Sequence, residues 1–134
     1  MENNLKFPTI FLYNLGKEFI LSLERVFQTM KRLNFSKFEA EVYVHLAKAG
    51  PKSGKDIAEY LDLTQQQLHT VIKNLQNKGA IKISRRKTTL FSASSFEEIL
   101  NSFIETNIHQ AQFIQRTKQG LLSSWQEIID KDDH

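Results

Sequence analysis

The sequence predicts a mainly α-helical fold that contains one small β-hairpin. A helix-start signature occurs four times, and each copy opens a stretch in which apolar residues recur at helical spacing. Farther along the chain, two short runs alternate apolar and polar residues around a polar turn, which is the pattern of a hairpin. With 134 residues, the chain fits one domain with an appended arm.

The four predicted helix starts share one capping pattern. A serine or threonine hydroxyl can accept a hydrogen bond from the amide three residues on, while a glutamate or glutamine there reaches back to the capping amide. Both amides are then satisfied together, so this spacing marks a helix N-terminus. An aspartate is a shorter variant that still complements the helix dipole. The pairs are Ser36 with Glu39, Ser53 with Asp56, Thr64 with Gln67, and Ser95 with Glu98.

Three short helices are expected in the middle of the chain. The first covers about Lys37–Ala49 and ends at Gly50-Pro51, because glycine permits a left-handed cap and proline cannot continue a helix. The second covers about Gly54–Leu61, and the third about Gln65–Lys78, stopped by Gly79. The inward face of the first helix is expected to hold Phe38, Val42, Tyr43 and Leu46.

A hairpin follows the three helices. Its strands are expected at Ala80–Ser84 and Thr89–Ala93, on either side of a basic turn. Three short helices followed by a hairpin is the element order of a winged helix-turn-helix domain. We therefore expect a helical arm at residues 1–34, a winged helix-turn-helix domain at 35–94, and a C-terminal dimerisation helix at 95–134.

Long helices are expected on both sides of this domain, at about Leu15–Leu33 and Phe96–Ile129, with a kink or break in the second near Gly120. Their apolar stripes suit coiled-coil pairing in a homodimer. The alternative is that both helices fold back on their own domain as core. The residues expected at the dimer contact are Phe19, Leu23, Val26, Ile104, Ala111, Ile114, Leu121, Trp125 and Ile128.

The charge of the chain is unevenly distributed. Its net charge is +3, but the stretch between Leu63 and Phe96 holds six Lys and Arg residues and no Asp or Glu. The remaining 12 basic and 15 acidic residues leave the rest of the chain at −3. A basic stretch in an otherwise acidic chain is typical of a protein that binds a polyanion, although a solvated surface has the same composition.

Other residue patterns argue against an enzyme. There is no cysteine, which excludes disulfides, thiolate nucleophiles and cysteine-rich zinc sites. The four histidines lack metal-ligand spacing, and the five glycines are isolated, so neither a metal site nor a phosphate-binding loop is expected. No secretory signal and no membrane-spanning run is apparent. We expect a cytoplasmic, non-enzymatic protein with no catalytic residues, no metal and no cofactor.

The middle of the chain resembles the TrmB-type family of archaeal and bacterial regulators, with a looser similarity to MarR-type regulators. The resemblance covers about Leu33–Leu100 and implies DNA binding as a dimer, with the third helix in the major groove. The residues that carry it are Leu33-Asn34-Phe35-Ser36, Glu39-Ala40, Val42-Tyr43, Leu46, Gly50-Pro51, Ser53, Asp56-Ile57-Ala58, Leu61, Leu68, Ile72, Leu75 and Lys78-Gly79-Ala80-Ile81.

The chain also departs from that family. TrmB-like recognition helices often begin with a basic residue and carry a tyrosine, whereas Gln65, Gln66 and His69 stand here. The operator sequence of relatives is therefore not transferable. Full-length relatives often carry a C-terminal domain that senses sugars; we expect this chain to end before such a domain, and no residue identifies a small-molecule effector.

The periodicity of the third helix defines the candidate DNA contacts. If Leu68, Val71, Ile72 and Leu75 face the core, the remaining polar residues face outward. Glutamine can pair with adenine, threonine can donate or accept, and lysine can reach guanine or phosphate. The basic turn suits a wing on the phosphate backbone. The candidate DNA contacts are Ser53, Gln65, Gln66, His69, Thr70, Lys73, Arg85, Arg86 and Lys87.

Three functions remain open at this point. The leading one is a homodimeric transcriptional regulator that binds double-stranded DNA. A second is an architectural protein that binds DNA independently of sequence. A third is a winged-helix module that contacts other proteins.

Overall fold

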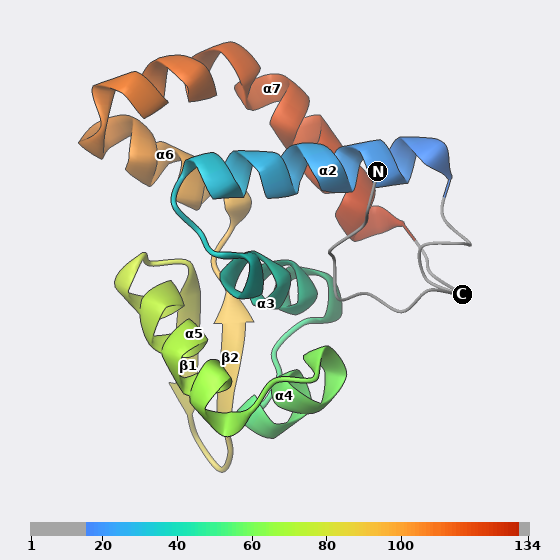
Figure 1. The fold of residues 1–134 in the computed structure, drawn as a ribbon, viewed down its shortest axis with the longest axis vertical. Coiled ribbons are helices and arrows are strands. Elements are labelled where there is room, and N and C mark those ends of the chain that lie inside the picture. The colour runs from blue at the N-terminus through green and yellow to red at the C-terminus, as the bar shows by residue number, and fades with distance from the viewer. Residues whose placement is uncertain (1–15, 132–134) are drawn as a thin grey trace. The chain divides into compact units, whose positions relative to one another are not determined.

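The computed structural model describes residues 16–131 and consists of helices and one hairpin (Figure 1). Among these residues, 36–95 form one compact unit, and 16–35 together with 96–131 form a second. We call them the winged unit and the helical unit. The elements in chain order are α2 (Lys17–Arg32), α3 (Lys37–Ala49), α4 (Gly54–Leu61), α5 (Gln65–Asn77), β1 (Ile81–Arg85), β2 (Thr89–Ala93), α6 (Phe96–Thr106) and α7 (Ile108–Asp130).

The expected helix starts are confirmed. α3 and α5 each open with a complete capping box, in which both reciprocal hydrogen bonds are present. The Ser53 hydroxyl accepts from the Asp56 amide at 3.2 Å and opens α4, and α6 begins at Phe96, directly after Ser95. Gly50 and Gly79 follow α3 and α5 with φ of 90° and 71°, the conformation in which glycine ends a helix without strain.

The hairpin is antiparallel, with Ile81 opposite Ala93 and Arg85 opposite Thr89. The first strand thus begins one residue later than expected and includes Arg85. A further backbone pairing joins Lys52 to Phe91, through hydrogen bonds of 3.0 and 2.8 Å. This single-residue bridge, which the sequence did not predict, ties the start of α4 to β2.

The core of the winged unit lies between α3, α5 and the hairpin. Tyr43 of α3 is fully buried, and its hydroxyl donates a 2.7 Å hydrogen bond to the carbonyl oxygen of Ser94. The Ser94 hydroxyl donates in turn to the carbonyl oxygen of Gly79 at 2.8 Å. These bonds join the two ends of the hairpin to α3, because a buried phenol is stable only when its hydroxyl has a partner.

The helical unit contains two C-terminal helices where one was expected. The break falls at Asn107, so the expected break near Gly120 is wrong. Asn107 is the N-cap of α7, and its side chain accepts from the amide of Gln110 at 3.1 Å. Gly120 lies inside α7, where a Cβ atom would be 3.3 Å from the Arg25 guanidinium. Glycine at this position therefore gives room to a neighbouring helix.

α2 packs antiparallel to α7. The Gln110 side chain donates to the carbonyl oxygen of Arg32 at 2.6 Å, and Arg25 lies 3.4 Å from the hydroxyl of Ser124. α6 also packs on α7, with the Phe96 and Trp125 rings 4.7 Å apart. Within residues 16–131, no helix combines the length and apolar character needed to cross a membrane.

This packing corrects the expected dimer surface. Six of the nine residues assigned to it are almost completely buried within a single chain, because α2, α6 and α7 cover one another. The buried stripes pack against one another within the helical unit of one chain. The six are Phe19, Leu23, Val26, Ile114, Leu121 and Ile128, whereas the partly exposed three are Ile104, Ala111 and Trp125.

Candidate nucleic-acid interface

α4 and α5 form a helix-turn-helix whose turn is held by backbone conformation and burial. Asp62 adopts the left-handed conformation with φ of 56°. The next residue, Leu63, is buried, and its amide donates to the carbonyl oxygen of Ala58 at 2.9 Å. At the other end of α4, a Cβ atom on Gly54 would lie 3.2 Å from a Leu68 methyl group. The two helices are therefore closely packed along the turn.

α5 has one buried face and one exposed face. Its four apolar residues at 68, 71, 72 and 75 are buried. The polar residues that the periodicity turns outward are exposed, and they are Gln65, Gln66, His69, Thr70 and Lys73. The helix consequently presents several hydrogen-bonding side chains, together with the cation of Lys73, on its outer face.

The turn of the hairpin is exposed and cationic. Arg85 is the last residue of β1, and Arg86 and Lys87 lie in the turn before β2. All three side chains are exposed. Ser53 differs from these candidates because it is only partly exposed and its hydroxyl already caps α4.

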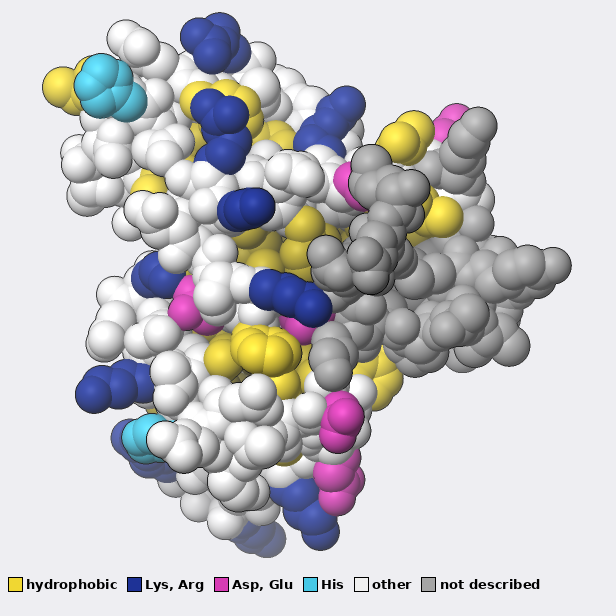
Figure 2. Space-filling view, viewed as in Figure 1, with side chains coloured by type: hydrophobic (Ala, Val, Ile, Leu, Met, Phe, Trp, Pro, Cys, Tyr) yellow, Lys and Arg dark blue, Asp and Glu magenta, His cyan; other side chains and the backbone are white. Residues whose placement is uncertain are grey.

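The exposed carboxylates of the winged unit lie on α4 and directly after it. Glu39 and Glu41 are buried, whereas Asp56, Glu59 and Asp62 are exposed on α4 or directly after it. On this unit, Figure 2 shows acidic side chains at the right edge and Lys and Arg side chains at the left edge and the lower end, with an acidic side chain also beside a basic one near the left edge. α5 and the hairpin carry no carboxylate, so nothing on these elements repels a phosphate.

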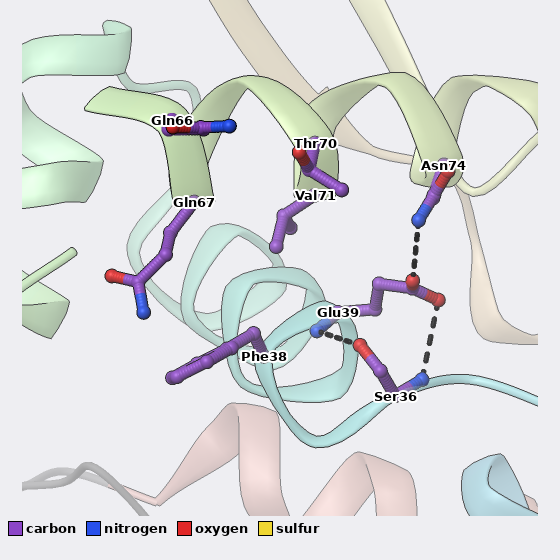
Figure 3. Close-up of a pocket in the computed structure, with 8 residues that line it drawn as sticks. All are labelled: Ser36, Phe38, Glu39, Gln66, Gln67, Thr70, Val71 and Asn74. Atoms are coloured by element: carbon purple, nitrogen blue, oxygen red, sulfur yellow. Dashed lines mark hydrogen bonds between the residues drawn. The ribbon is translucent and has the colours of Figure 1, made fainter. Parts of the chain in front are cut away.

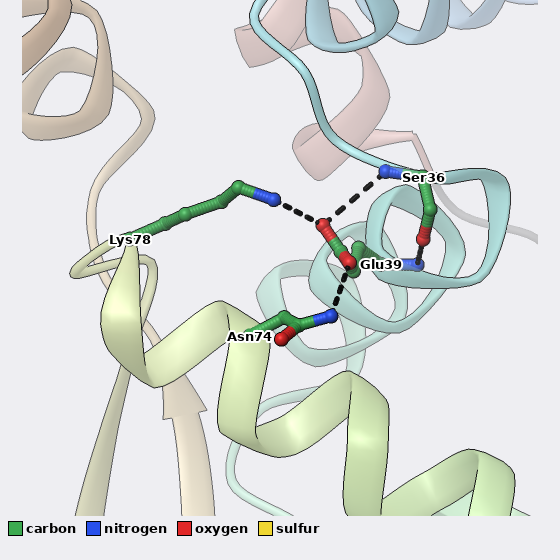
Figure 4. A network of polar contacts seen from close by, with 4 residues as sticks. All are labelled: Ser36, Glu39, Asn74 and Lys78. Atoms are coloured by element: carbon green, nitrogen blue, oxygen red, sulfur yellow. Dashed lines mark hydrogen bonds and ion pairs between the residues drawn. The ribbon is translucent and has the colours of Figure 1, made fainter.

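A buried carboxylate connects the start of α3 to the end of α5 (Figure 4). One oxygen of Glu39 accepts from the Lys78 ammonium at 2.6 Å and from the Ser36 amide at 3.2 Å. The other accepts from the Asn74 side chain at 3.0 Å. We call these four residues the Glu39 network. Lys78, which the sequence counted with the basic stretch, is therefore paired with a buried acid.

Opposing effects act on the Glu39 carboxyl. Burial by itself raises the pKa of this group, because it disfavours the charged form. The hydrogen bonds from Lys78, Asn74 and the Ser36 amide, together with the positive charge of Lys78, favour the charged form and outweigh burial. The pKa of Glu39 therefore lies below its ordinary value, and the group is ionised at neutral pH.

A groove of about 330 Å³ runs between the first turn of α3 and α5 (Figure 3). Phe38 forms one wall and is only partly buried, so its expected place in the core is corrected: it lies in the first turn, at the edge of the α3 face. Gln66 and Thr70 from the outer face of α5 line the other side. The remaining lining residues are Ser36, Glu39, Gln67, Val71 and Asn74.

The histidine in α3 is part of the packing. His45 is buried and stacks on Tyr60 with ring centroids 4.1 Å apart. Burial lowers the pKa of His45, and the charge of Lys52 lowers it further, so the imidazole is neutral at pH 7. In residues 16–131, no group of three or more histidine or carboxylate side chains is arranged to hold a metal ion.

A helix-turn-helix followed by an exposed hairpin defines the winged helix-turn-helix class. Residues 30–97 match the family described as "Sugar-specific transcriptional regulator TrmB". The chain belongs to the TrmB family of transcriptional regulators, which confirms the resemblance seen in the sequence.

The chain is similar to a regulator from Pyrococcus furiosus, the HTH-type sugar sensing transcriptional regulator TrmBL1. The two are 23% identical over 105 residues, which cover 78% of this chain and 30% of that protein. This chain thus matches less than a third of its relative.

Two solved structures are similar at 16% identity and a TM-score of 0.46. One is a MarR-like transcriptional regulator from Thermotoga maritima, with 88% of this chain and 96% of that one covered. The other is NadR in complex with 4-hydroxyphenylacetate, with coverage of 98% and 100%.

The Glu39 network predicts a pH-dependent contribution to stability. Glu39→Gln should lower the free energy of unfolding at pH 7 by roughly 1.5–3 kcal/mol, the range for hydrogen bonds to a charged group. Because the folded pKa is lowered, this stability is present above the unfolded pKa and is lost as the pH falls through the folded pKa.

Urea unfolding of both proteins at pH 7 and at about pH 3.5 checks this prediction, since an unperturbed glutamate titrates near 4.3. The difference between them should shrink in acid. Glu59→Gln, an exposed and charge-matched control, should change stability by less than about 0.5 kcal/mol. An equal difference at both pH values would contradict the pH-dependent role of the carboxylate.

Proposed function

We propose that this protein regulates transcription by binding double-stranded DNA as a homodimer, with α5 in the major groove and the hairpin on the phosphate backbone. The carboxylate-free face formed by α5 and the hairpin turn supports this proposal most directly. Membership in a family of transcriptional regulators supports it further. A protein with this role needs no catalytic residue, and DNA as its target implies a cytoplasmic location.

The outer face of α5 has the chemistry of base readout. Gln66, Thr70 and Lys73 are exposed and lie within two turns of one helix. A glutamine amide can pair with adenine N6 and N7, and lysine can reach guanine or phosphate. Recognition helices present such side chains from their N-terminal half. We therefore assign sequence recognition to α5.

Gln66→Ala should reduce the preference for a selected DNA sequence over random DNA by about 5- to 150-fold, because a bidentate base contact contributes roughly 1–3 kcal/mol of discrimination. The preferred sequence is first selected from a random pool with the wild-type protein. Competition mobility-shift assays then compare the two proteins. Gln112→Ala, an exposed change in α7, serves as the control. An unchanged preference would show that Gln66 does not contact bases.

The hairpin turn is assigned to backbone contact. Arg85, Arg86 and Lys87 are exposed cations at the tip of a two-stranded sheet. Such contacts set register and affinity without reading sequence. Each phosphate that they neutralise releases counterions, so binding weakens as salt rises.

The double change Arg85→Ala with Arg86→Ala should weaken binding to all DNA sequences alike. It should also reduce the slope of log affinity against log salt by about 0.9 for each phosphate that the protein no longer neutralises. Titrations with preferred and random DNA at several salt concentrations measure both effects. A slope equal to that of the wild type would exclude these arginines from the interface.

A homodimer would let the protein recognise a longer DNA site than one winged domain can. One winged domain reads a few base pairs, whereas a two-fold dimer reads two half-sites about 34 Å apart. Because the apolar stripes of α2 and α7 are buried within the chain, we place the dimer contact elsewhere in the helical unit. Ile108 is 77% exposed at the start of α7, and Ile104 and Ala111 beside it in sequence are partly exposed. We assign the second copy to this turn.

Sedimentation at micromolar concentration should show a dimer for the wild type and a monomer for Ile108→Glu. A glutamate there places a charge in an apolar contact without touching the core of the unit. Leu21→Glu, which changes a residue 58% exposed on α2, should leave the dimer intact. A monomeric wild type would end the dimer proposal, and a dimer disrupted only by Leu21→Glu would move the contact to α2.

The same DNA assays separate the other two functions. Equal competition by random and selected DNA would identify an architectural DNA-binding protein. No mobility shift at low salt would favour a protein-interaction module. The exposed cations of the hairpin turn favour DNA over the interaction module.

A further inference from the structure

The Glu39 network joins two places in the winged unit that are far apart in sequence. Glu39 lies in the first turn of α3, and its partners Asn74 and Lys78 lie 35 and 39 residues later, at the end of α5. The glutamate is only 4% exposed. These are directional, charge-assisted bonds in a protected site, where such bonds are strongest.

Apolar packing and polar contacts constrain α5 in different ways. The buried leucine, isoleucine and valine side chains decide which face of α5 turns inward, and their close packing limits the angle of the helix. The hydrophobic effect itself has no direction. Directional hydrogen bonds at the end of the helix restrict its angle further.

The two oxygens of Glu39 supply that constraint. Asn74 and Lys78 are one turn apart on the same edge of α5, and each binds a different carboxylate oxygen. The carboxylate itself is held by the Ser36 amide at the start of α3. A helix held at two successive turns cannot slide or rotate far without breaking one of these part-buried hydrogen bonds.

The edge of α5 that binds Glu39 continues into the outer face that we assign to base contact. Gln66, Thr70 and Asn74 follow one another at intervals of four residues, so they form a single row along α5. Gln66 and Thr70 line the same groove as Glu39 (Figure 3). A change in the angle of α5 at Asn74 is therefore transmitted along the row to the side chains assigned to base contact.

We propose that Glu39 is a positioning residue for sequence recognition: by holding Asn74 and Lys78, it fixes the angle of α5 so that its outer side chains reach base edges together. This inference rests on the proposed function. Base contacts need placement to within about 0.5 Å and 10–20°, whereas phosphate contacts tolerate more. Loss of the network should therefore affect specific binding more than nonspecific binding.

Affinity for preferred and random DNA tests the inference at a pH and temperature where every variant is folded. Glu39→Gln should reduce the preference for the selected sequence by about tenfold, while affinity for random DNA and the salt slope stay at wild-type values. Lys78→Met should act like Glu39→Gln, and Lys78→Arg, which keeps the charge and the donors, should retain the preference. Glu59→Gln, which removes an exposed acid of the same unit, is the matched control.

A DNA-free measurement reports the placement of α5 relative to α3. The chain has no cysteine, so spin labels can be attached at Ala49→Cys in α3 and Gln76→Cys in α5, both exposed positions. Glu39→Gln should broaden or shift the distance distribution between the labels, and Glu59→Gln should leave it unchanged. A merely stabilising glutamate would leave the distribution of the folded protein as it was.

The outcomes separate this role from the proposed function. If the wild type binds no DNA, the proposed function fails and the positioning role fails with it. If the wild type discriminates between sequences and Glu39→Gln discriminates equally well, the positioning role alone is overturned. An identical distance distribution in the two proteins overturns it whatever the DNA assays give.

Discussion

The winged unit depends on one packing constraint: α5 buries a single apolar stripe against the rest of the unit. Leu68, Val71, Ile72 and Leu75 occupy that stripe, and burying residues of this size contributes roughly 1.5–3 kcal/mol each. The helical period then forces the intervening residues outward. Burial of the apolar stripe is thus sufficient to expose Gln66 and Thr70. The same stripe anchors the helix that precedes the hairpin, so the wing is placed by the same burial.

The distribution of carboxylates is the second organising feature. The winged unit has acidic residues, but they are either buried in α3 or exposed on α4 and the turn after it. Burying the Glu39 carboxylate is costly unless its oxygens are hydrogen-bonded, which explains why an amide, a carboxamide and an ammonium all donate to it. The pairing neutralises Lys78, so the positive charge of the outer face comes from Lys73 and the hairpin. Lys78 thus contributes to stability, whereas Lys73 is available to bind a polyanion.

Features set by neighbouring residues were predictable from the sequence. Capping boxes act over three residues, and apolar periods act over one or two turns, so α3 and α4 begin and end where expected. The same local reasoning was available at Asn107, which has a glutamine three residues on, in the pattern of the other caps. The sequence instead predicted a break near Gly120, but the space around this glycine is set by Arg25 of another helix.

Features set by distant contacts could not be predicted. An apolar stripe shows that something covers it, but its composition does not say whether the cover is the same chain or a second copy. For this reason, Ile114, Leu121 and Ile128 were assigned to a dimer and are found in the core of the helical unit. The other partners of Glu39 could not be predicted for the same reason. The capping box alone accounts for a glutamate at this position, and Asn74 and Lys78 are distant from it in sequence.

The burial of these stripes changes what kind of dimer the proposed function requires. Two long apolar helices that paired across copies would make a dimer inseparable from folding. In the described residues these helices bury most of their apolar stripes against one another within one chain, so a second copy has to bind another surface of the helical unit. Association of two copies through another surface depends on protein concentration. DNA with two half-sites would then act as a template, because binding one copy raises the effective concentration of the next. Dimerisation and DNA binding are therefore linked equilibria under the proposed function, and each strengthens the other.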